Sequence, residues 1–220
     1  MRGLFITGTD TGVGKTYLTC RIARTWRLQG RNFRVMKPLA SGDGEDTRLL
    51  AQASGDDDLG AISPFRFTEP AAPPVAARKE GVHLEMESIV EAVRRRGNET
   101  DALLVEGVGG LLCPITDRDT VADLIKALQL PCVIVARRSL GTLNHTLLTL
   151  EVAKSRGIPT LGVVVSETTA PTSFAEQHNV AELQARCRVL EVLPFGIDTP
   201  DQLVCWSKVD WWSLQDAILD

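Results

Sequence analysis

The stretch G-T-D-T-G-V-G-K-T at residues 8–16 decides the fold of this chain. An apolar run from Leu4 to Ile6 precedes it and predicts a buried strand, and the segment from Tyr17 to Leu28 has the periodicity of an amphipathic helix. A glycine-rich turn between a strand and a helix is the setting of a phosphate-binding loop, because glycines let backbone N–H groups crowd around phosphate oxygens. The stretch therefore predicts a nucleotide-binding protein.

The spacing of this phosphate loop departs by one residue from the common pattern G-x-x-x-x-G-K-[ST], because Thr9 occupies the position of the first glycine. Lys15 is expected to reach the β and γ phosphates of a nucleotide, and Thr16 to offer its hydroxyl to Mg²⁺. The alternative is an ordinary glycine-rich turn between a strand and a helix. The residues expected to contact the nucleotide in this stretch are Gly12, Val13, Gly14, Lys15, Thr16 and Tyr17.

The whole chain has the length expected of a single domain over residues 1–220, with a formal net charge of −4. That charge argues against a general nucleic-acid surface. No apolar run is long enough to span a bilayer and the N-terminus lacks the organisation of a signal peptide, so a cytoplasmic location is expected. The 5 cysteines are scattered without a C-x-x-C pair, which favours small core residues over a metal or redox site, and the 3 histidines are too dispersed for a metal site.

A second lysine is expected beside the phosphate loop. Residues 33–36 predict a short strand, which Lys37 and Pro38 end. Ligands of open α/β sheets bind beyond the carboxyl ends of the strands, so Lys37 is expected on the same rim as the phosphate loop. The alternative for a lysine in this position is a solvated surface charge.

Two acidic residues are candidates for binding Mg²⁺. Asp46 stands at the start of a short predicted helix over residues 47–53, where it suits either a helix N-cap or a metal ligand that acts through water. Glu106 ends the apolar strand within D-A-L-L-V-E-G-V-G-G at residues 101–110, and in a phosphate-loop protein an acid so placed holds Mg²⁺ directly or through water. The alternative for Glu106 is a charge that only marks the end of a strand.

The second half of the chain repeats a strand followed by a helix. The strands are predicted at residues 132–136, 160–165 and 189–193, and the helices begin near residues 121, 142 and 174. Repeated alternation of this kind predicts a doubly wound α/β fold, a mostly parallel sheet with helices on both faces and right-handed crossovers.

Three other segments have weaker signals. Residues 62–77 contain prolines at positions 64, 70, 73 and 74 and are predicted to form an irregular loop, which at this length is usually functional. Residues 84–96 predict a helix whose Arg94–Arg96 run is a solvated end. A last helix is predicted near residues 209–219, and the tryptophans there are expected to pack, not to bind a cofactor: Trp206, Trp211 and Trp212.

With these features in place, the chain resembles the dethiobiotin synthetases, enzymes of biotin synthesis, from its first strand to about Pro194. The resemblance rests on five ordered motifs: G-T-D-T-G-V-G-K-T at residues 8–16, K-P-L-A-S-G at 37–42, F-T-E-P-A-A-P at 67–73, V-E-G-V-G-G at 105–110 and L-G-T-L-N-H-T at 140–146. Asp10 stands where the related partitioning ATPases carry a signature lysine, which argues against that branch of the phosphate-loop superfamily.

This resemblance implies that 7,8-diaminopelargonate, CO₂ and a nucleoside triphosphate are converted to dethiobiotin, nucleoside diphosphate and phosphate. One amine captures CO₂ as a carbamate, whose oxygen attacks the γ-phosphate to give a mixed anhydride. The second amine then closes the ureido ring as phosphate leaves. Such chemistry requires the protein to align three partners and to neutralise developing negative charge.

The resemblance also implies roles for individual residues. Lys15 and Thr11 lie on the phosphates, Lys37 bridges the carbamate and the γ-phosphate, and Ser41 lies at the diamine end. The family's Mg²⁺ positions match Thr16, Asp46 and Glu106, and further nucleotide contacts are expected at Glu106, Gly109, Ser166 and Pro194. The family works as a homodimer in which a helix start of the partner subunit receives the substrate carboxylate, here the segment with Gly141, Thr142 and Asn144.

One departure concerns the nucleotide base. Ser166-Glu167-Thr168 stands where some members carry an Asn-Asp pair whose asparagine recognises adenine. Two other functions are alternatives: a nucleotide-dependent switch or partitioning ATPase, which would not need Lys37, and the synthetase part of a cobyrinate-type amidase. The chain is too short to include the glutaminase half of such an amidase, and a nucleophilic cysteine with a histidine partner is not apparent.

Overall fold

The computed structural model describes residues 1–167, 169–170, 172–195 and 207–216, and its centre is a six-stranded sheet with strand order β2-β5-β1-β6-β7-β8. Every neighbouring pair in this sheet is parallel. The strands are β1 (Gly3–Gly8), β2 (Phe33–Met36), β5 (Ala102–Glu106), β6 (Cys132–Arg137), β7 (Thr160–Ser166) and β8 (Val189–Leu193). The predicted doubly wound fold is confirmed, and each of these strands overlaps a segment predicted from its apolar residues.

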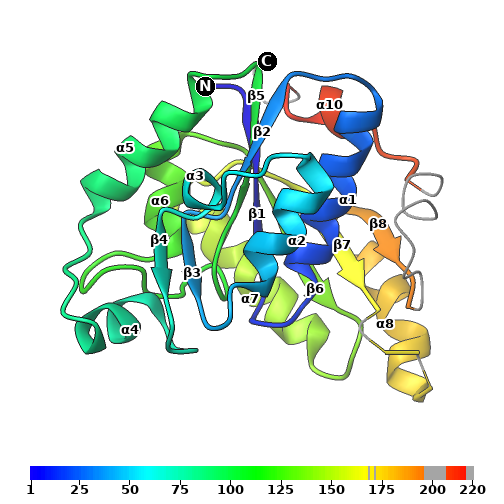
Figure 1. Ribbon diagram of the computed structural model, residues 1–220. Helices are drawn as coiled ribbons and strands as arrows, with labels where there is room; N and C mark the ends of the chain where they lie inside the picture. The colour runs from blue at the N-terminus through cyan, green and yellow to red at the C-terminus, as the bar shows by residue number, and fades with distance from the viewer. Residues whose placement is uncertain (168, 171, 196–206, 217–220) are drawn as a thin grey trace.

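Helices cover both faces of the sheet (Figure 1). Side chains along a strand alternate between the two faces, so that Leu4 and Ile6 pack on one side of the sheet and Phe5 on the other. The first face packs against α1 (Lys15–Leu28), α2 (Glu45–Ser54), α3 (Leu59–Ile62) and α10 (Trp211–Leu214). The second packs against α4 (Pro73–Lys79), α5 (Met86–Gly97), α6 (Val121–Leu128), α7 (Thr142–Ser155) and α8 (Phe174–Gln184).

The phosphate loop, residues 8–16, joins β1 to α1 at the middle of the sheet. From β1 the chain crosses to β2 on one side, whereas from β5 it crosses to β6 on the other side of β1. The loop therefore lies at the point where the winding direction changes, which is where open α/β sheets bind their ligands. Thr9 N donates a hydrogen bond to Val135 O at 2.9 Å, which ties the start of the loop to β6.

The prediction that residues 62–77 are irregular is wrong. A small parallel sheet forms between β3 (Leu39–Ser41) and β4 (Phe65–Phe67), and α4 follows, at the lower left of Figure 1. Proline is disruptive inside a helix but not in its first turn, where its missing N–H has no partner to lose. Pro73 and Pro74 lie in that first turn of α4, so they favour the start of a helix.

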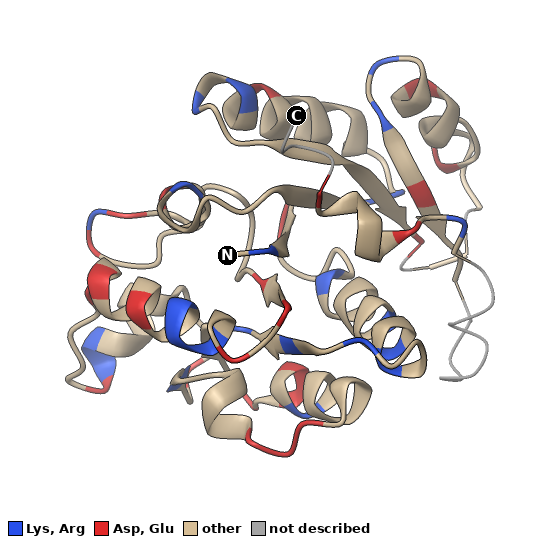
Figure 2. Cartoon of the chain, turned by 90° about the horizontal axis from the view of Figure 1, so that it is seen from above, with Lys and Arg blue, Asp and Glu red and all other residues tan. Residues whose placement is uncertain are grey.

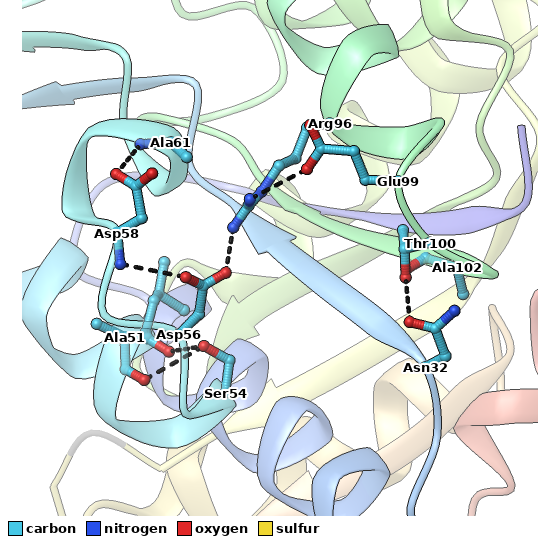
Figure 3. Close-up of polar contacts among 11 residues, drawn as sticks. Asn32, Ala51, Ser54, Asp56, Asp58, Ala61, Arg96, Glu99, Thr100 and Ala102 are labelled. Carbon is cyan, nitrogen blue, oxygen red and sulfur yellow. Dashed lines mark hydrogen bonds and ion pairs between the residues drawn. The ribbon is translucent and has the colours of Figure 1, made fainter.

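The interpretation of Arg94–Arg96 as a solvated helix end is wrong for Arg96. Arg94 and Arg95 are exposed, but Arg96 is 8% exposed and forms an ion pair with Asp56, which follows α2 (Figure 3). A second, longer contact joins Arg96 Nη1 to Glu99 Oε2 at 3.4 Å. Arg96 therefore fixes the segment between α2 and α3 against the end of α5.

The C-terminal segment packs on α1 and on the N-terminus, as predicted for its tryptophans. Trp211 is buried, and Trp212 makes an edge contact with Trp26 at 5.2 Å between ring centroids. The guanidinium of Arg2 lies 4.5 Å from the centre of the Trp212 ring, and Asp216 Oδ1 accepts a hydrogen bond from Arg2 Nε at 2.7 Å. The predicted helix over residues 209–219 is shorter than expected where it is described, because α10 ends at Leu214, and Trp206 lies outside the described residues.

Basic and acidic residues are interspersed around the chain (Figure 2), which fits the modest net charge of −4. Four cysteines are free thiols, and Cys205 lies outside the described residues. Within the described part of the chain, no helix combines the length and the apolar character needed to cross a membrane.

Candidate active site

The phosphate loop adopts a conformation that requires glycine. Gly12 and Gly14 have φ angles of 69° and 98°, in the left-handed region. A Cβ at Gly14 would lie 2.5 Å from Ser166 Oγ, so a larger residue has no space there. Gly14 is also the N-cap of α1, where no described side chain bonds to the helix, so the first-turn N–H groups are available to an anion.

Lys15 folds back over this loop. Its side chain is buried, and its Nζ donates a hydrogen bond to the main-chain oxygen of Asp10 at 2.9 Å. Burial lowers the pKa of Lys15 to about 8, although the carboxylate of Glu106 acts in the opposite direction. The ammonium group is therefore held at the loop with little surrounding water, where its charge acts strongly on a bound phosphate.

Four side chains from separate segments meet beneath the loop: Thr16, Lys37, Asp46 and Glu106. Lys37 Nζ lies 2.6 Å from Glu106 Oε1 and 2.8 Å from Asp46 Oδ2. Thr16 Oγ1 donates to the same Glu106 oxygen at 2.8 Å. Parallel pairing causes this meeting, because β2 and β5 are neighbours in the sheet and their carboxyl ends place Lys37 and Glu106 side by side.

Charge pairing favours the ionised forms of Lys37 and Asp46 despite their burial. Burial alone would lower the pKa of Lys37, but Glu106 and Asp46 outweigh it and hold that pKa above its ordinary value. Burial would likewise raise the pKa of Asp46, but Lys37 and Thr16 hold it below its ordinary value. The alternative of Lys37 as a solvated surface charge is wrong, because the side chain is 5% exposed.

The cluster has the chemistry of a site for a hard cation. Glu106 is 0% exposed, and its Oε2 atom has no hydrogen-bond partner among the described residues. A buried carboxylate oxygen without a partner is costly, and the hydroxyl and carboxylate oxygens beside it are donors that Mg²⁺ prefers. The described residues contain no group of three His, Cys, Asp or Glu side chains suited to a metal. The oxygens that meet here belong to two carboxylates and one hydroxyl. This set fits Mg²⁺, which usually keeps several waters.

A cavity of about 650 Å³ opens above this cluster. Nine residues predicted to belong to the site line it: Thr11, Gly12, Gly14, Lys15, Thr16, Lys37, Ser41, Asp46 and Gly109. Ser41 Oγ is buried without a hydrogen-bond partner among the described residues. Glu106 is not in the wall, but it lies directly behind Thr16 and Lys37.

Five other lining residues received no role from the sequence: Pro70, Ala71, Ala72, Val108 and Cys113. The first three belong to F-T-E-P-A-A-P, a motif that carries the family resemblance without an assigned role. Their segment is held from outside the cavity, because Glu80 Oε1 at the end of α4 accepts hydrogen bonds from Thr68 N at 2.7 Å and Thr68 Oγ1 at 2.8 Å. The proline and alanine residues of this motif are the feature of the sequence from which an apolar cavity wall could be predicted.

The remaining predicted nucleotide contacts do not line the cavity: Val13, Tyr17, Ser166 and Pro194. Val13 is fully buried, and Pro194 follows β8 at the same edge of the sheet. Ser166 is 5% exposed at the end of β7, packed against Gly14. The next residue, Glu167, pairs with Arg138 and accepts a hydrogen bond from Phe195 N at 3.2 Å. Base recognition by Ser166 stays a prediction.

The predicted carboxylate-binding segment lies outside the cavity wall of its own chain. Gly141, with φ 91°, is the N-cap of α7, Asn144 is exposed, and Thr142 is buried with its hydroxyl 3.4 Å from that of Thr146. Leu140, which precedes the helix, is 82% exposed. The segment therefore faces outward and does not contribute to the cavity of its own subunit.

Comparison with known proteins places this geometry among phosphate-loop proteins. A family model described as AAA domain matches residues 2–199. The septum site-determining protein MinD complexed with Mg-ADP from Pyrococcus horikoshii OT3 has a similar fold, with a TM-score of 0.56 at 16% identity over 92% of this chain and 85% of that chain. Chloroplast FtsY from Physcomitrella patens has a TM-score of 0.54 at 19% identity, covering 100% of this chain and 65% of that chain. At such identities the likeness concerns the fold alone.

Curated relatives named ATP-dependent dethiobiotin synthetase BioD are similar in sequence over most of the chain. The protein of Anaeromyxobacter dehalogenans (strain 2CP-C) is 46% identical over 83% of this chain and 84% of its own length. That of Bacillus velezensis is 39% identical over 86% and 84% of the two chains. That of Methanococcus vannielii is 37% identical over 74% and 78%.

Proposed function

The chain belongs to the family of ATP-dependent dethiobiotin synthetases, and we propose that the cavity at its phosphate loop is where the reaction occurs. It is an ATP-dependent ligase of biotin biosynthesis, which uses a diamine, CO₂ and a nucleotide. The observation that supports this location most strongly is the burial of Lys37 between Asp46 and Glu106 at the floor of the cavity.

The chemistry divides into three steps. An amine of 7,8-diaminopelargonate attacks CO₂ and loses a proton, which gives a carbamate. The carbamate oxygen attacks the γ-phosphorus, and the bond from that phosphorus to the β-γ bridging oxygen breaks as the diphosphate leaves. The second amine then attacks the carbamate carbon, loses a proton and expels phosphate, which closes the ring. Each step brings anions together, so positioning and positive charge are what the protein must supply.

The phosphate end of the cavity suits a triphosphate. Lys15 and the uncapped first turn of α1 supply positive charge and N–H donors on one wall, and Thr11 adds a hydroxyl at the rim. Gly12 and Gly14 allow the backbone to approach the phosphate oxygens closely. In this proposal the γ-phosphate points toward Lys37.

Thr16, Asp46 and Glu106 would hold Mg²⁺. When bound, Mg²⁺ supplies positive charge that stabilises the charge developing on the β and γ phosphate oxygens. The partnerless Glu106 oxygen supports this assignment. Lys37 shares Glu106 Oε1 with Thr16 and also pairs with Asp46, so a metal ion bound there would share these oxygens with the lysine.

The position of Lys37 between the two carboxylates and the cavity gives it its proposed catalytic role. Its ammonium group has three N–H donors, and it pairs with two carboxylates at the cavity floor. Because Lys37 lines the cavity, its ammonium group would contact the carbamate and the transferred phosphoryl group. Lys37 is then a catalytic residue that orients the attacking oxygen and stabilises the transition state.

The diamine end is proposed to be shared between subunits of a homodimer. Ser41 provides a polar anchor, while Pro70, Ala71 and Val108 offer apolar wall to the methylene chain. The cations in the described wall, Lys15 and Lys37, both lie at the phosphate end, so a receptor for the substrate carboxylate must come from elsewhere. The outward-facing start of α7 in a partner subunit, with Gly141, Thr142 and Asn144, would fill that role.

The direct test is to incubate the protein with the diamine, bicarbonate, Mg²⁺ and ATP and to detect dethiobiotin by mass spectrometry. Product that depends on all four reagents and is absent in the Lys15→Ala variant is expected. Product formed normally by that variant would exclude this cavity as the site of reaction, and ATP hydrolysis independent of the diamine would favour a nucleotide-dependent switch.

A further inference from the structure

The phosphate loop contains a carboxylate that nucleotide binding does not explain. Asp10 lies between Thr9 and Thr11, at the crown of a loop that must receive a polyanion. Its Oδ1 atom accepts a hydrogen bond from Thr11 N at 2.7 Å, and its Oδ2 atom accepts one from Arg137 Nη2 at 2.6 Å. An uncompensated negative charge in this loop would repel the phosphate groups of a bound nucleotide.

Arg137 is brought to Asp10 by the sheet itself. In the parallel pair of β1 and β6, Gly8 lies opposite Val135. Two residues later on both segments, the same register brings Asp10 opposite Arg137. The Arg137 side chain is partly buried against the loop. Its Nη2 atom also lies 3.5 Å from Thr11 O, and its Nε atom is buried without a partner among the described residues. Neither Arg137 nor Asp10 lines the cavity, but Thr11 does, and its N–H is bonded to the carboxylate that Arg137 holds.

We infer, on the basis of the function proposed above, that Arg137 is a positioning residue of the phosphate loop, which cancels the charge of Asp10 and fixes its carboxylate against Thr11. The same loop residue is linked to the proposed catalytic machinery through its main chain, because Asp10 O accepts the hydrogen bond from Lys15 Nζ. Arg137 therefore sets both the charge at the crown of the loop and the position of the group that holds Lys15.

If Arg137 acts by neutralising Asp10, its variants should behave differently from those of an arginine that contacts phosphate directly. Arg137→Gln leaves Asp10 uncompensated and is expected to weaken ATP binding about 10-fold or more. Asp10→Asn in the Arg137→Gln background removes the repelling charge and is expected to restore binding nearly to the wild-type level. Raising the salt concentration should shrink the defect of Arg137→Gln, because screening reduces repulsion between partly exposed charges.

The experiment is isothermal titration of wild type, Arg137→Gln, Asp10→Asn, the double variant and Arg95→Gln with ATP, at low and high salt, together with thermal unfolding of each. Arg95 is an exposed arginine on α5, far in sequence from the loop, and serves as the matched control. Weak binding by Arg137→Gln, with recovery in the double variant and unchanged unfolding temperatures, supports the inference.

Other outcomes overturn it in distinct ways. Binding that stays weak in the double variant shows direct contact between Arg137 and phosphate. Normal ATP affinity in Arg137→Gln shows that the pair has no part in nucleotide binding. A wild-type protein that binds no ATP contradicts the proposed function itself, and the inference with it.

Discussion

Lys37 Nζ, at the floor of the cavity, lies 2.6 Å from Glu106 Oε1 behind it, and both side chains are almost completely buried. Removing two charges from water is costly, and a buried ion pair often stabilises a fold no better than well-packed apolar residues. A buried ion pair beneath a phosphate loop is better explained by a role in the reaction than by a contribution to the stability of the fold.

Lys37→Gln is expected to lower kcat roughly 10²-fold or more, because a neutral side chain cannot stabilise charge on the carbamate and the transferred phosphoryl group. Glutamine keeps a hydrogen-bond donor for Glu106, so the fold should survive. Steady-state kinetics test the rate, and ATP titration should show nearly normal binding. A variant with a normal rate would return Lys37 to a structural role.

Glu106→Gln is expected to raise the Mg²⁺ concentration needed for half-maximal rate by about tenfold or more. Asp46→Asn should have a smaller effect, because Asp46 is partly exposed and water can take its place. Measuring the rate against Mg²⁺ concentration tests both, with Glu45→Gln as control because Glu45 is an exposed neighbour on α2. Identical curves for all variants would remove both acids from the metal site.

Mixing Lys15→Ala subunits with Asn144→Ala subunits is expected to restore activity. In the hybrid dimer, one site combines the intact phosphate loop of one subunit with the intact α7 start of the other. Equal mixing with free exchange should recover about a quarter of the wild-type rate, since half the dimers are hybrids with one intact site each. Absence of recovery despite demonstrated subunit exchange would contradict a shared site.

The nucleotide base is expected to be selected weakly. An asparagine side chain can make two hydrogen bonds to adenine, whereas Ser166 has one hydroxyl, which lies packed against Gly14. Contacts to the triphosphate are the same for every nucleotide, so they cannot replace that selectivity. Measuring kcat/KM for ATP, GTP, CTP and UTP tests this, and a preference for ATP above about 10³-fold would contradict it.

Asp123→Ala is expected to lower the free energy of unfolding by about 1 kcal/mol at neutral pH, because Asp123 completes the capping box of α6 with Thr120. Burial would raise the pKa of Asp123, but the bonds from Thr120 and the charge of Arg156 hold it below its ordinary value. This contribution is present above the ordinary aspartate pKa and is lost as pH falls through the lowered one.

The matched control for Asp123 is Asp57→Ala, because Asp57 is exposed and its carboxylate has no hydrogen bond or ion pair with the described residues. Urea unfolding at neutral and acidic pH measures the difference. If the difference in free energy of unfolding between wild type and Asp123→Ala stays constant down to strongly acidic pH, capping by the carboxylate is not the cause of that difference.

The central strands and the phosphate loop could be predicted from the sequence because their signals are local. Leu4 to Ile6 is apolar, the loop is rich in glycine, and α1 begins where the pattern changes. Glu106 at the end of β5 is predictable for the same reason. The burial of Lys37 could not be predicted, because it depends on β5 lying beside β2, a pairing between residues that are far apart in the chain.

Other predictions are wrong because they apply a rule for short stretches of sequence without knowing the position in the helix or the partner from elsewhere in the chain. The prolines at 73 and 74 predict an irregular loop, but they lie in the first turn of α4, where the rule reverses. The Arg94–Arg96 run predicts a solvated end, but a partner 40 residues earlier, Asp56, keeps Arg96 at the interior. Arg137 had no signal of its own, since only the register of β6 against β1 brings it to Asp10.

The position of β1 in the sheet has a consequence for synthesis of the chain on the ribosome. β1 emerges first, yet its neighbours begin at Ala102 and Cys132. At about 5–20 residues per second, the strand G-L-F-I-T-G waits several seconds or more without a partner, as an exposed apolar segment. The phosphate loop, anchored through Val135, cannot take its final form before β6 has left the ribosome. The nascent protein is therefore unable to bind nucleotide until β6 has been made, and β1 stays available to a chaperone during that interval.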